Sequence, residues 1–191
     1  DLLTYVLDSA ERLNRFIQNL LDMTKLSHGS LQVKREWVEF PVILDHAMER
    51  LRKELSGHKI EIDTDGSLVS LHVDPAMMEQ VLTNILDNAS EHTLPGTRIR
   101  ISFRKDNKKA IIRIADEGPG IPEKERMLVF DMFYRVRATH SKAAGTGLGL
   151  AICKGLIEAH EGEIYAENGI DKKGVAIVMT FPASMARGES A

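Results

Sequence analysis

The sequence has little of several features that mark whole classes of protein. Its 191 residues include one cysteine, so no disulfide can form within the chain, which is typical of a reducing compartment. Lysine and arginine (25) do not outnumber aspartate and glutamate (28), and a net charge of -3 gives no basic footprint for nucleic acid. No apolar run approaches the roughly 20 residues of a membrane-spanning helix, and no signal-peptide pattern opens the chain. A membrane link would therefore have to come from a segment outside this sequence.

Residues 1–28 have the pattern of one long amphipathic helix. Mostly apolar residues recur there at alternating steps of three and four, the spacing of a helix that packs against another helix. They are Leu3, Val6, Ala10, Leu13, Ile17, Leu20 and Thr24. A single helix cannot bury such a stripe by itself. We therefore expect a partner helix, either upstream of Asp1 or in another chain.

Strand and helix patterns intermix in the rest of the chain. The expected strands are 59–63, 69–73, the hairpin 97–116, 162–168 and 174–182, with 29–40 as a linker or first strand. The expected helices are 41–57, 75–91, 123–133 and 147–160. This mixture predicts an α+β fold, in which helices cover one face of a single sheet across residues 41–184. The last residues, 185–191, have the composition of a frayed tail.

Two asparagines interrupt the apolar pattern of the expected helix 75–91. Asn84 and Asn88 are four residues apart, so their side chains project from the same face of the helix. A single asparagine in a helix usually faces water or caps a neighbouring loop. Two stacked amides can instead offer carbonyl oxygens to a hard cation such as Mg²⁺.

The segment ADEGPGIP, residues 115–122, places a carboxylate at the end of an expected strand. Asp116 is followed by Gly118 and Gly120, which would let a ligand approach the backbone closely. A fixed carboxylate there could accept a hydrogen bond from an exocyclic amine such as that of adenine. Taken alone, the segment also fits a simple turn after a hairpin.

Three alternating glycines, Gly145, Gly147 and Gly149, precede the expected helix 147–160. Backbone N–H groups at a helix start face a ligand with the positive end of the helix dipole, which favours phosphate. A flexible hinge would have the same composition. The spacing matches neither the dinucleotide-binding GxGxxG pattern nor a P-loop, since no Gly-Lys-Ser/Thr follows.

The order of these segments resembles the nucleotide-binding domain of sensor histidine kinases, in the GHKL ATP-binding superfamily. The N, G1, F and G2 boxes of that family resemble the asparagine helix, the Asp116 segment, VFDMFYR at 129–135 and GTGLGL at 145–150. The resemblance covers about residues 31–184, and it implies a mixed sheet of about five strands with about three helices on one face. Residues 12–31 look like the second helix of the family's dimerisation hairpin. LHVDPAMMEQVLTNILDNA and FYRVRATHSKAAGTGLGLAI look most like the potassium-responsive KdpD-type kinases.

The resemblance implies an ATP site that uses Mg²⁺. It assigns the Mg²⁺ ion to Asn88, the vicinity of the phosphates to Asn84 and the adenine amine to Asp116, and His92 stands where an aromatic ring commonly covers the base. Residues 121–146 would form a lid. The other implied nucleotide contacts are Gly118, Gly120, Ile121, Tyr134, Arg135, Gly145, Thr146, Gly147, Leu148 and Gly149.

Three further observations refine this hypothesis. Glu91 stands where the family usually has Lys or Arg three residues after the Mg²⁺ asparagine. Asn84 stands where ATP-hydrolysing relatives carry the glutamate that activates water, which favours transfer over hydrolysis. None of the seven histidines has the acid and Arg-Thr-Pro context of the family's phosphoacceptor, so this chain is expected to carry no catalytic acceptor residue.

The implied function is that of the catalytic portion of a protein-histidine kinase. It would transfer the γ-phosphoryl group of ATP to a histidine on the absent first hairpin helix, for relay to an aspartate of a response regulator. The full protein would be a homodimer through its hairpin, and this portion a cytoplasmic domain of an inner-membrane sensor. The alternatives are a GHKL-type Ser/Thr kinase of a partner protein and a docking module that binds no nucleotide.

Overall fold

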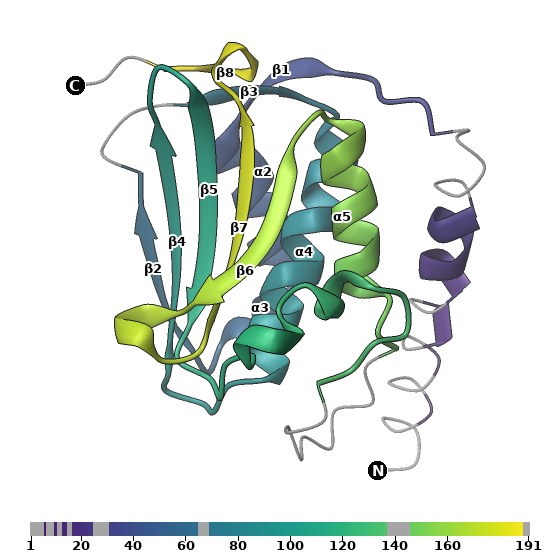
Figure 1. The fold of residues 1–191 in the computed structure, drawn as a ribbon, viewed down its shortest axis with the longest axis vertical. Coiled ribbons are helices and arrows are strands. Elements are labelled where there is room, and N and C mark those ends of the chain that lie inside the picture. The colour runs from purple at the N-terminus through teal and green to yellow at the C-terminus, as the bar shows by residue number, and fades with distance from the viewer. Residues whose placement is uncertain are drawn as a thin grey trace.

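The structure is a computed structural model, and it describes residues 6, 10, 13–14, 17–24, 31–64, 69–136 and 146–188. Its main sheet has five strands in the order β2-β4-β5-β7-β6, as Figure 1 shows. These strands are β2 (Lys59–Asp63), β4 (Arg98–Lys105), β5 (Lys109–Asp116), β7 (Val175–Pro182) and β6 (Glu163–Asn168). Strand β2 runs parallel to β4, and every other neighbouring pair is antiparallel. The expected mixed sheet of five strands is therefore confirmed.

Three helices cover one face of this sheet, which confirms the expected two layers: α2 (Phe40–Arg50), α4 (Pro75–Glu91) and α5 (Gly149–Ala159) (Figure 1). Alternate residues of the strands, such as Ile99, Ile101 and Phe103, are buried against them. Helix α4 starts where the sequence predicted, because the Asp74 carboxylate accepts a hydrogen bond from the Met77 N–H at 3.2 Å.

The opposite face of the main sheet carries ion pairs and a small buried cluster around Ile170 rather than α-helices. Arginines and acids on neighbouring strands meet at 2.8 Å for Arg100–Glu61, 2.8 Å for Arg113–Glu167 and 2.6 Å for Arg104–Asp63. Charged partners opposite one another suit a face exposed to water. The functional site must therefore be sought at the helix side or at the ends of the strands.

A second, smaller sheet corrects two predictions from the sequence. Strand β3 (Ser70–Val73) pairs with β1 (Glu36–Glu39) and with β8 (Ala186–Arg187), and it does not join the main sheet. The prediction of a single sheet was therefore incomplete. The prediction of a frayed tail from residue 185 was wrong up to Arg187, because Met185 and Ala186 are buried and β8 is paired with β3.

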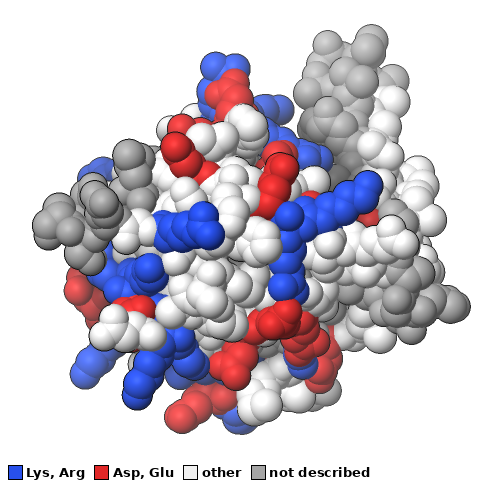
Figure 2. All heavy atoms as spheres, turned by 90° about the horizontal axis from the view of Figure 1, so that it is seen from above, with Lys and Arg blue, Asp and Glu red and all other residues white. Residues whose placement is uncertain are grey.

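Aromatic and charged side chains gather on the small sheet. The rings of Trp37 and His72 stack with their centroids 5.0 Å apart, and the Arg187 guanidinium lies 3.8 Å from the centre of the Trp37 ring. Figure 2 shows the molecule from this end, with basic and acidic residues interspersed over the coloured surface. This face does not present the continuous basic surface of a nucleic-acid-binding protein.

Two of the expected helices differ in detail. The expected helix 41–57 is divided at Leu51 into α2 and the short α3 (Arg52–Leu55), because Leu51 has a non-helical backbone (φ -106°, ψ 20°). The expected helix 123–133 is replaced by two single turns of 3₁₀-helix, η1 (Glu123–Glu125) and η2 (Leu128–Phe130).

The N-terminal segment is described only in part. Residues 17–24 are helical, and the Asp22 carboxylate accepts a hydrogen bond from the Gln80 side chain of α4 at 2.7 Å. The remaining residues of the expected long helix lie mostly outside the described residues. Within the described ranges, no helix combines the length and apolarity needed for a membrane span.

Candidate functional site

The two asparagines of α4 meet the start of α5. The Asn84 amide donates a hydrogen bond to the Gly149 carbonyl oxygen at 3.4 Å. A Cβ atom added to Gly149 would lie 3.9 Å from the Asn88 side-chain nitrogen. Two segments that are 65 residues apart, both selected from the sequence, therefore share one site.

The start of α5 leaves backbone donors for a ligand. No side chain caps this helix, and Leu148, its N-cap residue, is fully buried. The first N–H groups of a helix have no partner within the helix, so they are free to bind an anion. Just before the helix, the Leu148 backbone N–H donates a long hydrogen bond, 3.4 Å, to the Thr146 hydroxyl oxygen.

Gly147 holds the segment before α5 against the end of the VFDMFYR segment. Its φ of +70° lies in the left-handed region, and an added Cβ atom would lie 2.8 Å from the Phe133 carbonyl carbon. The Phe133 N–H also donates a hydrogen bond to the Gly147 carbonyl oxygen at 2.9 Å. Only glycine fits this contact, so the F and G2 segments form one unit.

Asp116 is the buried carboxylate of the site. It is 4% exposed at the end of β5, and its Oδ1 accepts hydrogen bonds from the Gly118 N–H at 2.8 Å and the Val175 N–H at 3.2 Å. Burial raises the pKa of Asp116, while these two backbone donors oppose the rise. Among the described residues nothing donates to Oδ2, so that oxygen remains available to a ligand donor.

Glycines surround Asp116 on both sides. A Cβ atom at Gly118 would lie 2.9 Å from the His92 carbonyl oxygen, and one at Gly120 would lie 2.8 Å from the Gly174 carbonyl oxygen. Gly120 also has a positive φ of +75°. The backbone therefore encloses the carboxylate as closely as glycine permits.

The sequence reasoning missed two glycines of this enclosure. Gly169 and Gly174, in the turn between β6 and β7, each pack against the Asp116 carbonyl oxygen so closely that an added Cβ atom would overlap it. Gly174 also has a positive φ of +68°. The pair of glycines in NGIDKKG was the only signal, and it predicted no more than a turn.

An ion pair fixes the residue after Asp116. The Glu117 carboxylate accepts hydrogen bonds from the Arg98 backbone N–H at 2.9 Å and from its guanidinium at 2.6 Å. Asp171 also accepts from this guanidinium at 3.1 Å. The bonds from Arg98 lower the pKa of Glu117. These contacts tie the loop after β5 to the start of β4.

The other residues selected from the sequence lie around these two centres. Ile121 and Tyr134 pack against the main core, and the Tyr134 hydroxyl donates to the Glu125 carboxylate at 2.8 Å. Arg135 is exposed, as are Glu91 and His92 at the end of α4. Residues 137–145 of the expected lid (121–146), Gly145 among them, lie outside the described residues.

Among the described residues no cluster of three or more His, Cys, Asp or Glu side chains could hold a metal ion.

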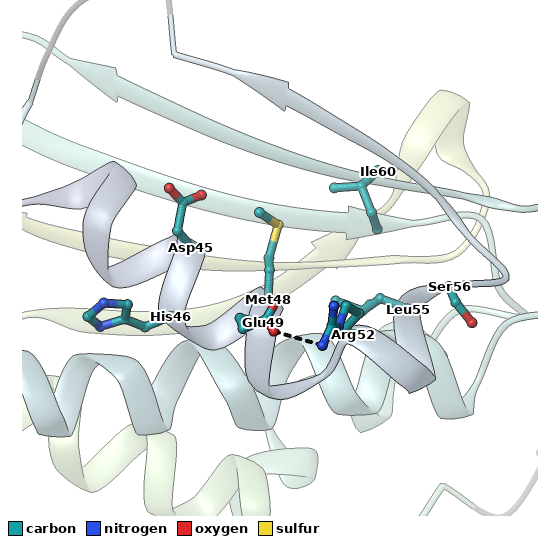
Figure 3. A pocket seen from close by; sticks show the side chains of 8 residues that line it. All are labelled: Asp45, His46, Met48, Glu49, Arg52, Leu55, Ser56 and Ile60. Carbon is teal, nitrogen blue, oxygen red and sulfur yellow. Dashed lines mark ion pairs between the residues drawn. The ribbon is translucent and has the colours of Figure 1, made fainter.

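A shallow pocket of about 530 Å³ lies on α2, α3 and β2, where Figure 3 shows the side chains that line it, from Asp45 to Ile60. None of the candidate site residues lines this pocket, so it is a separate feature.

Known proteins share the sequence pattern and the fold of this chain. Residues 73–185 match the model of the family described as histidine kinase-, DNA gyrase B- and HSP90-like ATPase. The sensor protein KdpD of Clostridium acetobutylicum is 36% identical over 169 residues, which are 88% of this chain. This chain spans only 19% of the length of that relative.

Solved structures show the same fold. The mycobacterial sensor histidine kinase MprB is 31% identical with a TM-score of 0.69, and the match covers 78% of this chain and 97% of that one. The histidine kinase ThkA, solved in complex with the response regulator protein TrrA, is 21% identical with a TM-score of 0.70, covering 90% of this chain and 49% of that one.

Proposed function

Because the chain belongs to the family of histidine kinase-, DNA gyrase B- and HSP90-like ATPases, as the catalytic domain of a sensor histidine kinase, we propose that it binds Mg²⁺-ATP between α4, α5 and the Asp116 loop. It would present the γ-phosphoryl group to a histidine on a hairpin helix outside this chain. The observation that carries the proposal is the buried Asp116 carboxylate with a free Oδ2. The 191 residues correspond to a small part of their KdpD relative, so the activity of the whole protein belongs to this proposal.

Asp116 would recognise the adenine ring. Its Oδ1 is already held by two backbone donors, which would leave Oδ2 to accept from the ligand. An acceptor fixed in a buried place discriminates strongly for a ligand that brings an N–H donor, because an unpaired carboxylate oxygen there would be costly. The exocyclic amine of adenine supplies that donor, and guanine has a carbonyl oxygen at the same position.

The asparagines and the start of α5 would hold the phosphates. The side chain of Asn88 makes no hydrogen bond among the described residues, and it faces the turn at Gly149. Its amide oxygen therefore fits the family's Mg²⁺ position, where one or two protein oxygens suffice and phosphates and water complete the octahedron. When bound, the ion would neutralise phosphate charge. Asn84 donates to the Gly149 carbonyl and would set the position of the α5 N–H groups.

The site favours transfer of the phosphoryl group over its hydrolysis. Asn84 occupies the place of the glutamate that activates water in ATP-hydrolysing relatives, and a neutral amide is a poor base. Phosphoryl transfer itself depends mainly on positioning and charge neutralisation, which backbone donors and a cation provide. Arg135, exposed just beyond the Phe133–Gly147 contact, would add positive charge near the terminal phosphate.

Exposed apolar side chains within residues 127–133 support transfer to a partner helix. Met127 is 85% exposed, and Phe133 is 61% exposed although its backbone is bonded to Gly147. Apolar groups gathered on a surface favour an interface. We propose that residues 1–28 form the second helix of the dimerisation hairpin and that this surface faces the hairpin. The full protein would be a homodimer, and a response regulator would take the phosphoryl group. The cytoplasmic side of a membrane-anchored sensor is the matching location.

Calorimetry tests the nucleotide site. We expect Mg²⁺-ATP to bind with a dissociation constant in the range of tens to hundreds of micromolar, roughly 5 to 6 kcal/mol. Asp116→Asn should abolish measurable binding. When the amide oxygen of Asn accepts from Gly118, its N–H₂ group takes the place of Oδ2, and two donors then face each other at the adenine amine. The exposed Asp131 of the F segment provides a matched Asp→Asn control. Binding that is unchanged in Asp116→Asn would remove the proposal, and no binding to the wild type would favour the nucleotide-free docking module.

The acceptor requires a separate experiment. The chain is incubated with labelled ATP, Mg²⁺ and a purified upstream segment that contains the acceptor histidine. Acid-labile, alkali-stable label on that segment is expected, since phosphohistidine has this stability. Acid-stable label on a serine or threonine would support the alternative of a GHKL-type Ser/Thr kinase.

A further inference from the structure

Helices α4 and α5 are connected at both of their ends. The two helices pack together and run in opposite directions, so the first residue of each lies beside the last part of the other. At the phosphate end Asn84 donates to the Gly149 carbonyl oxygen at 3.4 Å. At the opposite end the Asp74 N–H donates to His160 Nε2 at 2.9 Å. The pair therefore forms a frame with the proposed nucleotide site at one end only.

His160 is a buried, neutral part of this frame. It is 1% exposed, and because a backbone N–H can only donate, Nε2 must accept from Asp74. Its proton then lies on Nδ1, which donates to the Leu156 carbonyl oxygen at 2.7 Å. The ring thus connects the last turn of α5 to the residue that caps α4, and both of its nitrogens are used.

The linker before β1 is bound to this same end. The Lys34 backbone N–H donates to Asp74 Oδ2 at 3.0 Å, while Asp74 Oδ1 caps α4. The Arg35 guanidinium donates to the Ala159 carbonyl oxygen at 3.1 Å and pairs with the Glu161 carboxylate at 2.8 Å. One residue therefore holds the linker to α4, and its neighbour holds the linker to α5.

We propose that these contacts of Lys34, Arg35, Asp74 and His160, here called the linker anchor, couple the position of residues 31–36 to the phosphate end of the nucleotide site. The inference rests on the proposed function for the identity of that far end. Helices are stiff elements, and Asn88 lies about 21 Å along α4 from Asp74 at the usual rise per residue. A displacement of the linker would move both helix ends that carry the site. Coupling of this kind is reciprocal, so bound nucleotide would in turn hold the linker.

The first test uses hydrogen exchange on the whole chain without nucleotide. Arg35→Ala removes the contacts to Ala159 and Glu161 from a side chain that is 26% exposed, so the fold should persist. We expect exchange in residues 31–36 to rise about tenfold, as for a lost charge-assisted hydrogen bond, and exchange in residues 146–152 to rise several-fold. Arg52→Ala is the control, because this arginine also pairs with a glutamate, Glu49 at 3.1 Å, but lies on α3.

Two outcomes of that test decide the inference. Faster exchange in both segments supports coupling. Faster exchange in residues 31–36 alone would show that the anchor acts only locally, and it would overturn the proposal. Glu161→Gln, which removes only the ion pair, provides a milder second variant with the same expected pattern at smaller amplitude.

The second test adds Mg²⁺-ATP. In the wild type, saturating nucleotide should slow exchange in residues 31–36, and Arg35→Ala should weaken ATP binding about fivefold, the lower range of coupling between sites. Equal affinity in both proteins would contradict the coupling even if the site is correct. Absence of binding in the wild type would refute the proposed function instead, and the nucleotide-free exchange would still decide whether the linker is coupled to residues 146–152.

Discussion

The two ends of the proposed nucleotide site are built differently. At the adenine end Asp116 is buried, its Oδ1 is held by two backbone donors, and three glycines (Gly118, Gly169 and Gly174) pack around it. At the phosphate end one long hydrogen bond, 3.4 Å from Asn84 to Gly149, joins two helices whose facing groups are half-buried. We therefore propose that the base meets a preformed acceptor. The phosphate end would be completed when the nucleotide and its cation arrive.

The largest effect is expected from a substitution that disrupts the packing around Asp116. Gly174→Ala should destabilise the protein by roughly 3 kcal/mol or more, because φ is +68° and the new methyl group would overlap the Asp116 backbone. Gly96→Ala is the matched control, since Gly96 also has a positive φ (+88°) but has nothing within 4 Å. The free energy of unfolding should fall by only about 1 kcal/mol in Gly96→Ala. Urea denaturation measures both, and equal losses would show that the enclosure of Asp116 is not tightly packed.

Gly147→Ala tests the phosphate end. The methyl group would press on the Phe133 backbone, so the start of α5 should move away from the asparagines. We expect ATP affinity to fall about tenfold, a loss of about 1.4 kcal/mol, while adenosine affinity stays unchanged. Titration of the variant with both ligands measures this. A parallel loss for adenosine would mean that the two ends do not act separately.

A smaller effect is expected from charge at the rim of the phosphate end. Glu91 is exposed and makes no ion pair or hydrogen bond among the described residues, so Glu91→Lys should tighten ATP binding two- to threefold, about 0.5 kcal/mol. Glu158→Lys makes the same change of charge on an exposed residue near the far end of α5. Equal gains in both variants would assign the effect to net charge rather than to the position of Glu91.

The smallest effect concerns the stability of the nucleotide-free protein. Burial raises the pKa of Asp116, so folding favours its protonated form. The stabilisation that comes from this preference for the protonated form is fully present below the pKa of Asp116 in the unfolded chain. It is lost as pH rises through the higher pKa of the folded protein. Asp116→Asn cannot ionise, so its stability relative to wild type should increase across that window and stay higher at neutral pH. Thermal unfolding at a series of pH values measures this, and a constant difference between the two proteins would contradict it.

Parts of both ends of the proposed site could be predicted from the sequence. Asp74 and Pro75 fixed the start of α4, and the step of four between Asn84 and Asn88 placed both amides on one face, as the structure confirms. Asp116 could be placed because a strand pattern ended at it and glycines followed. The roles of these residues in binding ATP and Mg²⁺ remain predictions.

Long-range pairing explains most of what the sequence did not reveal. Strand β8 has two residues, too few for an alternating pattern, and its partner Leu71 lies more than 100 residues earlier in the chain. Gly169 and Gly174 resembled ordinary turn residues, because their importance comes from Asp116, which is distant in sequence. No glycine or proline stands at the break at Leu51, so the sequence predicted a helix that continues through this position.

The small sheet has a consequence for exchanging this domain between proteins. Residues 36–39, which receive the chain from the linker, and residues 186–187 both pair with β3, so the entry and exit strands share one sheet. A domain whose two ends lie close together can be inserted into another protein, because the new protein has to fit it at only one place. Chimeric kinases that keep β1, β3 and β8 together should therefore fold more readily than those divided between residues 40 and 69.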